Sequence, residues 1–169
     1  AHYTVLRVPY VNQLSPATGL SPKVGDFACG PACAAMVAAY YGGDAPSLER
    51  ATILAGGRSI VGRGVMPWQV AQLVRTLAPA ARADAAQAPN AAIALSLVGR
   101  EVRLQRPLVA LTKPSWVVTA INHYVVIAGL DARRERVVLN DPLAGPSVSL
   151  PWHVFAKAWH DVRWVRPYS

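Results

Sequence analysis

The chain has 169 residues, of which 53% are apolar, and it carries a formal net charge of +8 at pH 7. This length suits a single domain over residues 1–169 with a core of its own, and the apolar content excludes a disordered chain. The Lys and Arg residues are scattered, without a basic stripe or a recognition motif, which favours a basic surface over a nucleic-acid partner. No apolar run is long enough to cross a membrane, so we expect no transmembrane segment.

The cysteine and histidine content limits the disulfide and metal chemistry that we expect. Cys29 and Cys33 are four residues apart, a spacing that stacks two side chains on one helix face without good disulfide geometry. The four histidines show no ligand spacing with these cysteines, so we expect neither a metal site nor another cofactor. The chain begins at Ala1 without a signal peptide, from which we expect a mature or trimmed product.

The predicted elements change in kind about halfway along the chain. The first half starts with an extended segment at 2–12 and a loop at 14–27. Four helices follow, at residues 30–41, 47–55, 67–77 and 91–98. The glycine-rich stretch 56–64 lacks the context of a phosphate cradle and is interpreted as a loop, and 78–89 as a connection with room for a short strand. The second half holds one short helix, at 151–160, and strands at 108–111, 123–130, 136–140, 148–150 and 163–168. Helices followed by an antiparallel sheet indicate the α+β class.

Cys29 lies where a loop enters the first predicted helix. Pro31 suits the first helical turn, where its missing N–H is not needed, and Gly42 suits the end of the helix. A thiol at this end of a helix lies at the positive pole of the helix dipole, which favours the nucleophilic thiolate. Such a cysteine is more often only a small buried residue, so a catalytic role depends on other groups nearby.

Two polar residues are expected at one end of the sheet. His123 begins the clearest strand, and Asp141 follows the next strand and precedes a proline. If the two strands pair as a hairpin, the carboxylate can hold the imidazole in one tautomer while the other ring nitrogen faces a thiol. Strand alternation turns Asn140 to the other face of the sheet, which favours Asp141 as the orienting acid.

An attack on an acyl carbon also needs a donor for the oxyanion. Gln13 precedes the cysteine loop, and its side-chain amide and the backbone N–H of Cys29 suit this role. Cys33, one helical turn beyond Cys29, is interpreted as a core residue. Trp116 is the tryptophan that we place nearest to a cleft. The alternative is a position in the core, which is commoner for tryptophan.

Four motifs in this order carry a family resemblance: Val-Pro-Tyr-Val-Asn-Gln at 8–13, Cys-Gly-Pro-Ala-Cys-Ala-Ala-Met at 29–36, His-Tyr-Val-Val-Ile-Ala-Gly at 123–129 and Asn-Asp-Pro at 140–142. From about residue 8 to 159 the chain resembles the papain-like cysteine peptidases related to the bacteriocin (double-glycine leader) processing peptidases. The resemblance implies a papain-like α+β fold in which an N-terminal helical half packs on a C-terminal antiparallel sheet.

The resemblance also implies roles for single residues. Cys29 matches the nucleophile, His123 the base, Asp141 the orienting acid and Gln13 the oxyanion donor, while Cys33 matches a second cysteine that is not catalytic. The implied partner is a peptide or protein substrate. The long interval between Gln13 and Cys29 looks like the freestanding bacterial relatives, often secreted or membrane-tethered, so we expect an extracellular or cell-surface monomer.

Two further classes of function remain open at this point. One is a peptide-binding module that keeps the fold without turnover. The presence of a residue of the right type at every catalytic position of the pattern argues against this class. The other is an acyl transferase or toxin effector that uses the same triad. Partitioning of an acyl-enzyme to amines rather than to water favours that second class.

Overall fold

The computed structural model describes residues 3–42, 44–119 and 121–168, without the side chains of 17, 160–164 and 168. His2 and the side chain of His160, two of the four histidines considered above, therefore lie outside the described residues. The elements are, in chain order, β1 (Tyr3–Val5), η1 (Pro16–Thr18), α1 (Pro22–Gly25), α2 (Cys29–Gly42), α3 (Leu48–Leu54), η2 (Gly57–Ile60), α4 (Pro67–Leu77), β2 (Arg82–Gln87), α5 (Ala91–Arg103), β3 (Leu108–Thr112), β4 (His123–Asp131), β5 (Arg136–Asp141), β6 (Gly145–Pro151), α6 (Trp152–Ala158) and β7 (Trp159–Tyr168).

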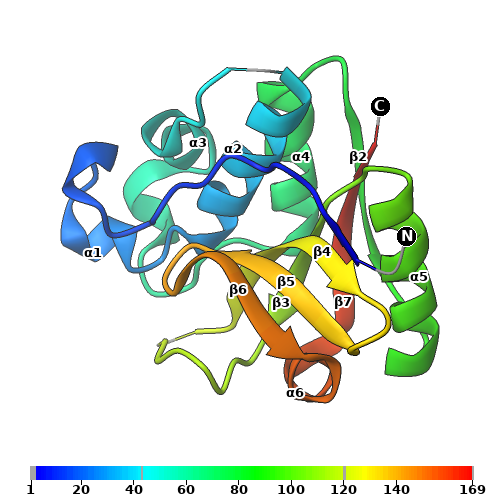
Figure 1. Cartoon of the computed structure of the whole chain (residues 1–169). Helices are drawn as coiled ribbons and strands as arrows, with labels where there is room; N and C mark the ends of the chain where they lie inside the picture. Colours follow the sequence, from blue (N-terminus) through cyan, green and yellow to red (C-terminus); the bar gives the residue numbers. More distant parts are fainter. Residues whose placement is uncertain (1–2, 43, 120, 169) are drawn as a thin grey trace.

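One antiparallel sheet organises the described part of the chain. Its strand order is β2-β7-β3-β4-β5-β6, and β1 pairs with the end of β4. Figure 1 shows α2, α3 and α4 grouped together, with α5 and α6 at separate places around the sheet. The predicted α+β class and its antiparallel sheet are confirmed, with one refinement: β1 and β2 come from the first half of the chain and join the sheet.

The middle of the sheet is buried on both faces. Every residue of β3 and β4 is buried, and alternate side chains enter two separate cores. Val109 and Val126 pack with α2 and α4 in the first core, whereas Ala110 and Val125 pack with α5 and α6 in the second. This arrangement explains why β4 reads as a continuous apolar run instead of an alternating one.

Helix α2 is the central helix of the first core. Its residues from Cys29 to Ala39 are all buried, most of them alanines and other small side chains that let neighbouring elements approach closely. A helix that is apolar on every side is one that the rest of the domain surrounds. No helix among the described residues has the length and apolar content that a membrane span requires.

Several local expectations differ from the structure. The 14–27 loop contains η1 and α1, because the Ser21 side chain caps a helical turn that begins with Pro22. The regular strand at the start ends at Val5, although the chain runs on toward residue 12 without regular structure. Helix α5 continues past the predicted end at 98 because Gly99 packs near Leu130, so that tertiary packing outweighs the low helix propensity of glycine.

Candidate active site

Cys29 is the first residue of α2 and is 2% exposed. The next residue is Gly30, where a Cβ would collide with the Val65 side chain and crowd the Tyr124 ring. Glycine at this position therefore lets the start of α2 approach β4, the strand that begins with His123. The Cys29 Sγ lies 4.0 Å from the backbone carbonyl of Asn122, the residue before that histidine.

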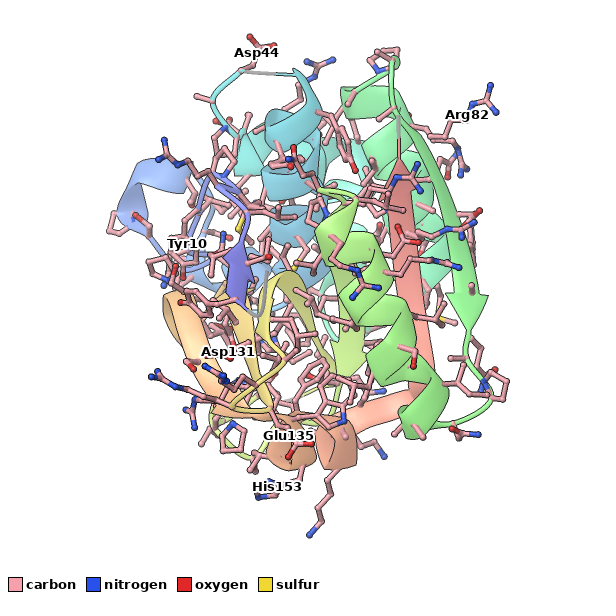
Figure 2. All side chains as sticks on the ribbon, turned by 45° about the vertical axis from the view of Figure 1, so that its right-hand side comes forward. Tyr10, Asp44, Arg82, Asp131, Glu135 and His153 are labelled. Carbon is pink, nitrogen blue, oxygen red and sulfur yellow. The ribbon has the colours of Figure 1, made fainter. Side chains whose placement is uncertain are left out.

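His123 and Asp141 form a fully buried pair at one end of the sheet. They are the first residue of β4 and the last residue of β5, which pair as an antiparallel hairpin. His123 Nε2 and Asp141 Oδ1 are 2.7 Å apart, and both side chains have 0% exposure. Figure 2 labels Asp131 and Glu135 at the turn of this hairpin, so the buried pair lies at the opposite end of its strands.

The second ring nitrogen of His123 is left for the thiol. Nδ1 is buried and makes no hydrogen bond of good geometry with any described residue, since Nε2 is the nitrogen that Asp141 holds. The Cys29 side chain is one of the groups that act on the imidazole. The structure thus brings Cys29, His123 and Asp141 together in the order in which thiol, base and orienting acid are needed.

The charged form of this pair is favoured at neutral pH. Burial lowers the pKa of His123, but the hydrogen bond with Asp141 and the nearby Cys29 side chain outweigh burial and raise that pKa from 6.5 to about 9. For Asp141, burial raises the pKa, but the hydrogen bond with His123 outweighs it, helped by the Leu143 N–H and the Trp116 indole, and the pKa is lowered. An imidazolium beside a carboxylate is the state that both shifts favour.

Asp141 is held by more groups than His123. Its Oδ1 also accepts from the backbone N–H groups of Leu143 at 2.8 Å and Ala144 at 3.1 Å, and its Oδ2 accepts from Trp116 Nε1 at 2.8 Å. The two backbone bonds form because Pro142 turns the chain back over the carboxylate, a common arrangement for aspartate in turns. The carboxylate is therefore fixed in one orientation, with an oxygen aimed at the imidazole.

Trp116 is the contact of Asp141 that the sequence predicts least well. It was expected near a cleft without a role, and the structure places its indole N–H directly on Asp141. The ring also packs on Phe155 of α6, with centroids 6.4 Å apart. Its position on the segment before the histidine strand was the only available signal, because residues 113–119 have no regular structure to predict.

Asn140 turns to the other face of β5, as strand alternation predicts. Its Nδ2 donates to the Val8 carbonyl at 3.0 Å, and its Oδ1 accepts from the Ser147 N–H at 3.1 Å. It joins the N-terminal segment to β6 and leaves Asp141 as the side chain that faces the imidazole.

Gln13 lies between the two halves of the site without a described contact to Cys29. Its side chain is buried, and its Nε2 donates to the carbonyls of Gly25 at 2.9 Å and Asp26 at 3.4 Å, in the turn ahead of the cysteine. Its backbone N–H donates to Pro142, next to Asp141. Gln13 therefore joins the cysteine loop to the aspartate turn, and its role as an oxyanion donor stays a prediction.

Cys33 is a core thiol. It has no exposed surface, and burial, together with the nearby Cys29 and Asp141, raises its pKa well above the ordinary value. Both cysteines are free, as the sequence predicts. Among the described residues no group of three or more His, Cys, Asp or Glu side chains is arranged to hold a metal ion.

Comparisons with known proteins agree with this geometry. A helix that presents a cysteine to a histidine at the end of an antiparallel sheet is the arrangement of the papain-like cysteine peptidase class. The model of the Peptidase_C39 like family matches residues 5–165, and the chain belongs to that family.

Solved structures show the same fold. The chain resembles a protein described as a C39-like peptidase from Bacillus anthracis, with a TM-score of 0.73, 20% identity and 98% of each chain covered. It also resembles UfSP from C. elegans, with a TM-score of 0.62 and 12% identity over 98% of this chain and 34% of that one. No match was found among curated proteins.

Proposed function

We propose that the protein is a cysteine peptidase that cleaves a peptide bond through Cys29, His123 and Asp141. The observation that carries the proposal is the buried pair 2.7 Å apart, which leaves the other histidine nitrogen for a cysteine at the start of a helix. A buried, hydrogen-bonded ion pair is expensive to desolvate, and such arrangements are typical of sites that perform acid–base chemistry.

The chemistry follows from these positions. The Cys29 sulfur attacks the peptide carbonyl and forms a tetrahedral intermediate, which expels the amine and leaves an acyl-enzyme. His123 holds the proton taken from the thiol and gives it to the leaving amine, while Asp141 keeps the ring aligned. Water, activated by the same imidazole, then hydrolyses the thioester and frees the thiol.

The oxyanion needs two donors in this mechanism. The backbone N–H of Cys29, at the helix start, is one of them. We assign the second to Gln13, whose Nε2 must exchange its 3.4 Å bond to Asp26 for the oxyanion when substrate binds. Hydrogen bonds that act in catalysis often reach their final geometry only in the complex with substrate. Gln13→Glu tests this role, because it keeps the size of the side chain and removes the donor.

The decisive experiment combines labelling with activity. Iodoacetamide should modify Cys29 in the native protein, and Cys29→Ala should abolish both the labelling and the cleavage of a peptide library without changing the circular dichroism spectrum. Cys33 has no exposed surface, so we expect it to stay unlabelled in the native protein. Native labelling that falls on Cys33 instead of Cys29 contradicts the proposal that Cys29 is the nucleophile.

A further inference from the structure

The segment at residues 8–13 is fastened to the turn that carries Asp141. Three consecutive carbonyls of that turn, at residues 141–143, each accept a hydrogen bond from the segment. The bonds run from the Tyr10 hydroxyl to Asp141 at 2.6 Å, from the Gln13 N–H to Pro142 at 2.9 Å and from the Asn12 side-chain amide to Leu143 at 3.5 Å. The position of the turn therefore depends on this segment as well as on β5.

The Tyr10 bond is the shortest of the three and the one made to Asp141 itself. Burial is the largest effect on the pKa of Tyr10 and raises it, so the hydroxyl keeps its proton and acts as a donor at neutral pH. Figure 2 shows Tyr10 well away from Asp131 and Glu135, which lie at the turn of the β4–β5 hairpin. Tyr10 thus acts at the other end of the hairpin, where His123 and Asp141 meet.

The same turn also orients the Asp141 carboxylate. Oδ1 accepts from the backbone N–H groups of Leu143 and Ala144, and it lies 2.7 Å from His123 Nε2. A shift of the turn moves these N–H groups and the carboxylate together, so it changes the alignment of the acid on the imidazole. Catalysis is sensitive to such shifts, because a misplacement of about 1 Å can cost roughly 100-fold in rate.

The segment also reaches the loop of the proposed nucleophile. Gln13 lies on the same segment as Tyr10, and its Nε2 donates to the Gly25 and Asp26 carbonyls ahead of Cys29. The segment therefore ties the turn of the acid to the loop that leads to the thiol, and the Tyr10 hydroxyl is its contact with the acid.

We propose that Tyr10 is a positioning residue of the reaction, whose hydroxyl holds the backbone of Asp141 where the carboxylate aligns the His123 imidazole. This inference rests on the proposed function, because the alignment affects a rate only if His123 transfers protons. Tyr10 acts through Asp141 and is assigned no contact with the substrate. Its bond should therefore affect kcat and leave KM almost unchanged.

Tyr10→Phe tests this role, because it keeps the ring and removes the donor. Its kcat should fall by roughly 3- to 20-fold, the size expected when a partly buried carbonyl loses a hydrogen bond. Its KM should stay within about twofold of the wild-type value. Steady-state kinetics on a peptide that the wild-type protein cleaves measure both quantities, and the thermal transition checks that the variant is folded.

Tyr41→Phe is the matched control. The Tyr41 hydroxyl also donates to a backbone carbonyl from a half-buried ring, that of Pro167 in β7 at 3.2 Å. This bond lies outside the proposed site, so kcat should stay within about twofold of the wild-type value. Because both variants lose the same atom, the comparison separates positioning of the acid from a general loss of stability.

A double variant asks whether Tyr10 acts through the acid. Asp141→Asn already loses the alignment, so adding Tyr10→Phe to it should cause less than about a twofold further loss. The rate at which iodoacetamide alkylates Cys29 provides a second readout for these slow variants, and it should show the same pattern.

The outcomes separate the two proposals. An unchanged kcat in Tyr10→Phe, an equal loss in Tyr41→Phe, or losses that multiply in the double variant overturn the inference and leave the peptidase intact. A wild-type protein that neither cleaves the peptide library nor is labelled at Cys29 overturns the proposed function, and the inference falls with it.

Discussion

Two carboxylates among the described side chains are completely buried, and their surroundings differ. Asp141 and Glu101 both have 0% exposure. Asp141 accepts hydrogen bonds from the half-buried Trp116 and from two backbone N–H groups, and one of its partners is a second buried titratable side chain, His123. Glu101, on α5, pairs with two arginines that reach solvent: Arg100 at 3.1 Å and Arg106 at 3.7 Å, with 51% and 35% exposed side chains.

The comparison teaches that burial of a carboxylate does not by itself mark a functional site. The Glu101 cluster (Arg100, Glu101 and Arg106) neutralises one charge and ends at solvent. The proposed catalytic cluster (Cys29, His123 and Asp141) continues from the carboxylate through an imidazole to a thiol. The chemistry that we propose depends on that continuation, and the following predictions test it.

Removal of the nucleophile should have the largest effect. Cys29→Ala should lower kcat/KM by roughly 10³- to 10⁶-fold, because no covalent intermediate can form. Cys33→Ala, on the same helix one turn away, should retain activity within a few-fold and lose stability only through a small cavity. Steady-state kinetics and mass spectrometry of the alkylated proteins measure the difference. Equal loss of activity in both variants would show that the effect is structural.

The sharpest test of the comparison replaces each carboxylate by its amide. Asp141→Asn should lower kcat by roughly 10²- to 10⁴-fold, because an amide neither fixes the imidazole in the required tautomer nor stabilises its charged form. Glu101→Gln makes the same chemical change at an equally buried position and should leave kcat within about twofold.

Both amide variants should lose some stability. For Glu101→Gln we expect about 1–2 kcal/mol, because the two arginines can turn to solvent. Chemical denaturation measures it. A large fall in kcat for Glu101→Gln, or none for Asp141→Asn, removes the distinction between the clusters.

The proposed catalytic cluster should also give stability a pH dependence in a defined window. The pKa of His123 is raised from 6.5 to about 9, so its contribution is fully present below pH 6.5 and is lost as the pH rises through 9. The amount is on the order of 3 kcal/mol for a shift of this size. The pKa of Asp141 is lowered, so its contribution is present above 3.8 and is lost as the pH falls further.

Urea denaturation from pH 6 to pH 10 measures this dependence. In Asp141→Asn the first of the groups that raise the histidine pKa is gone, and the alkaline loss of stability should become smaller. Glu101→Gln should keep the wild-type slope in this range. A slope that persists unchanged in Asp141→Asn would mean that another group causes it.

Much of this arrangement could be predicted because the signals are local. Helix α4 starts with Pro67 and has apolar residues at helical spacing, and its predicted bounds match the structure. The hairpin of β4 and β5 follows from two apolar runs joined by a short polar loop, and it places His123 and Asp141 at one end. These features need no knowledge of distant contacts.

The parts that were missed, or foreseen only as a possible short strand within 78–89, depend on distant partners. The segment of β2, Arg-Ala-Asp-Ala-Ala-Gln, contains no β-branched or aromatic residue and becomes a strand by pairing with β7 at the other end of the chain. The Trp116 bond to Asp141 joins an irregular segment to a strand end. Neither leaves a periodic pattern in the sequence.

The smallest effect concerns the far side of Asp141. Trp116→Phe keeps an aromatic ring against Phe155 and removes the indole N–H that Oδ2 accepts at 2.8 Å. Because this bond helps to lower the pKa of Asp141, its loss should raise that pKa and move the acid limb of kcat/KM to higher pH. At neutral pH we expect roughly a 3- to 10-fold loss, the size of a single hydrogen bond to a charged group that acts through the imidazole.

Trp152→Phe is the matched control, since Trp152 also packs on Phe155, at 5.7 Å between ring centroids, and is not among the donors to Asp141 in the described residues. It should leave the acid limb in place. If both variants shift the limb equally, Trp116 acts through the packing of α6; if only Trp116→Phe shifts it, the indole N–H positions the carboxylate. The second outcome extends the proposed catalytic cluster by one residue, to Trp116. The carboxylate of Glu101 differs in this respect, because the arginines that pair with it reach the surface.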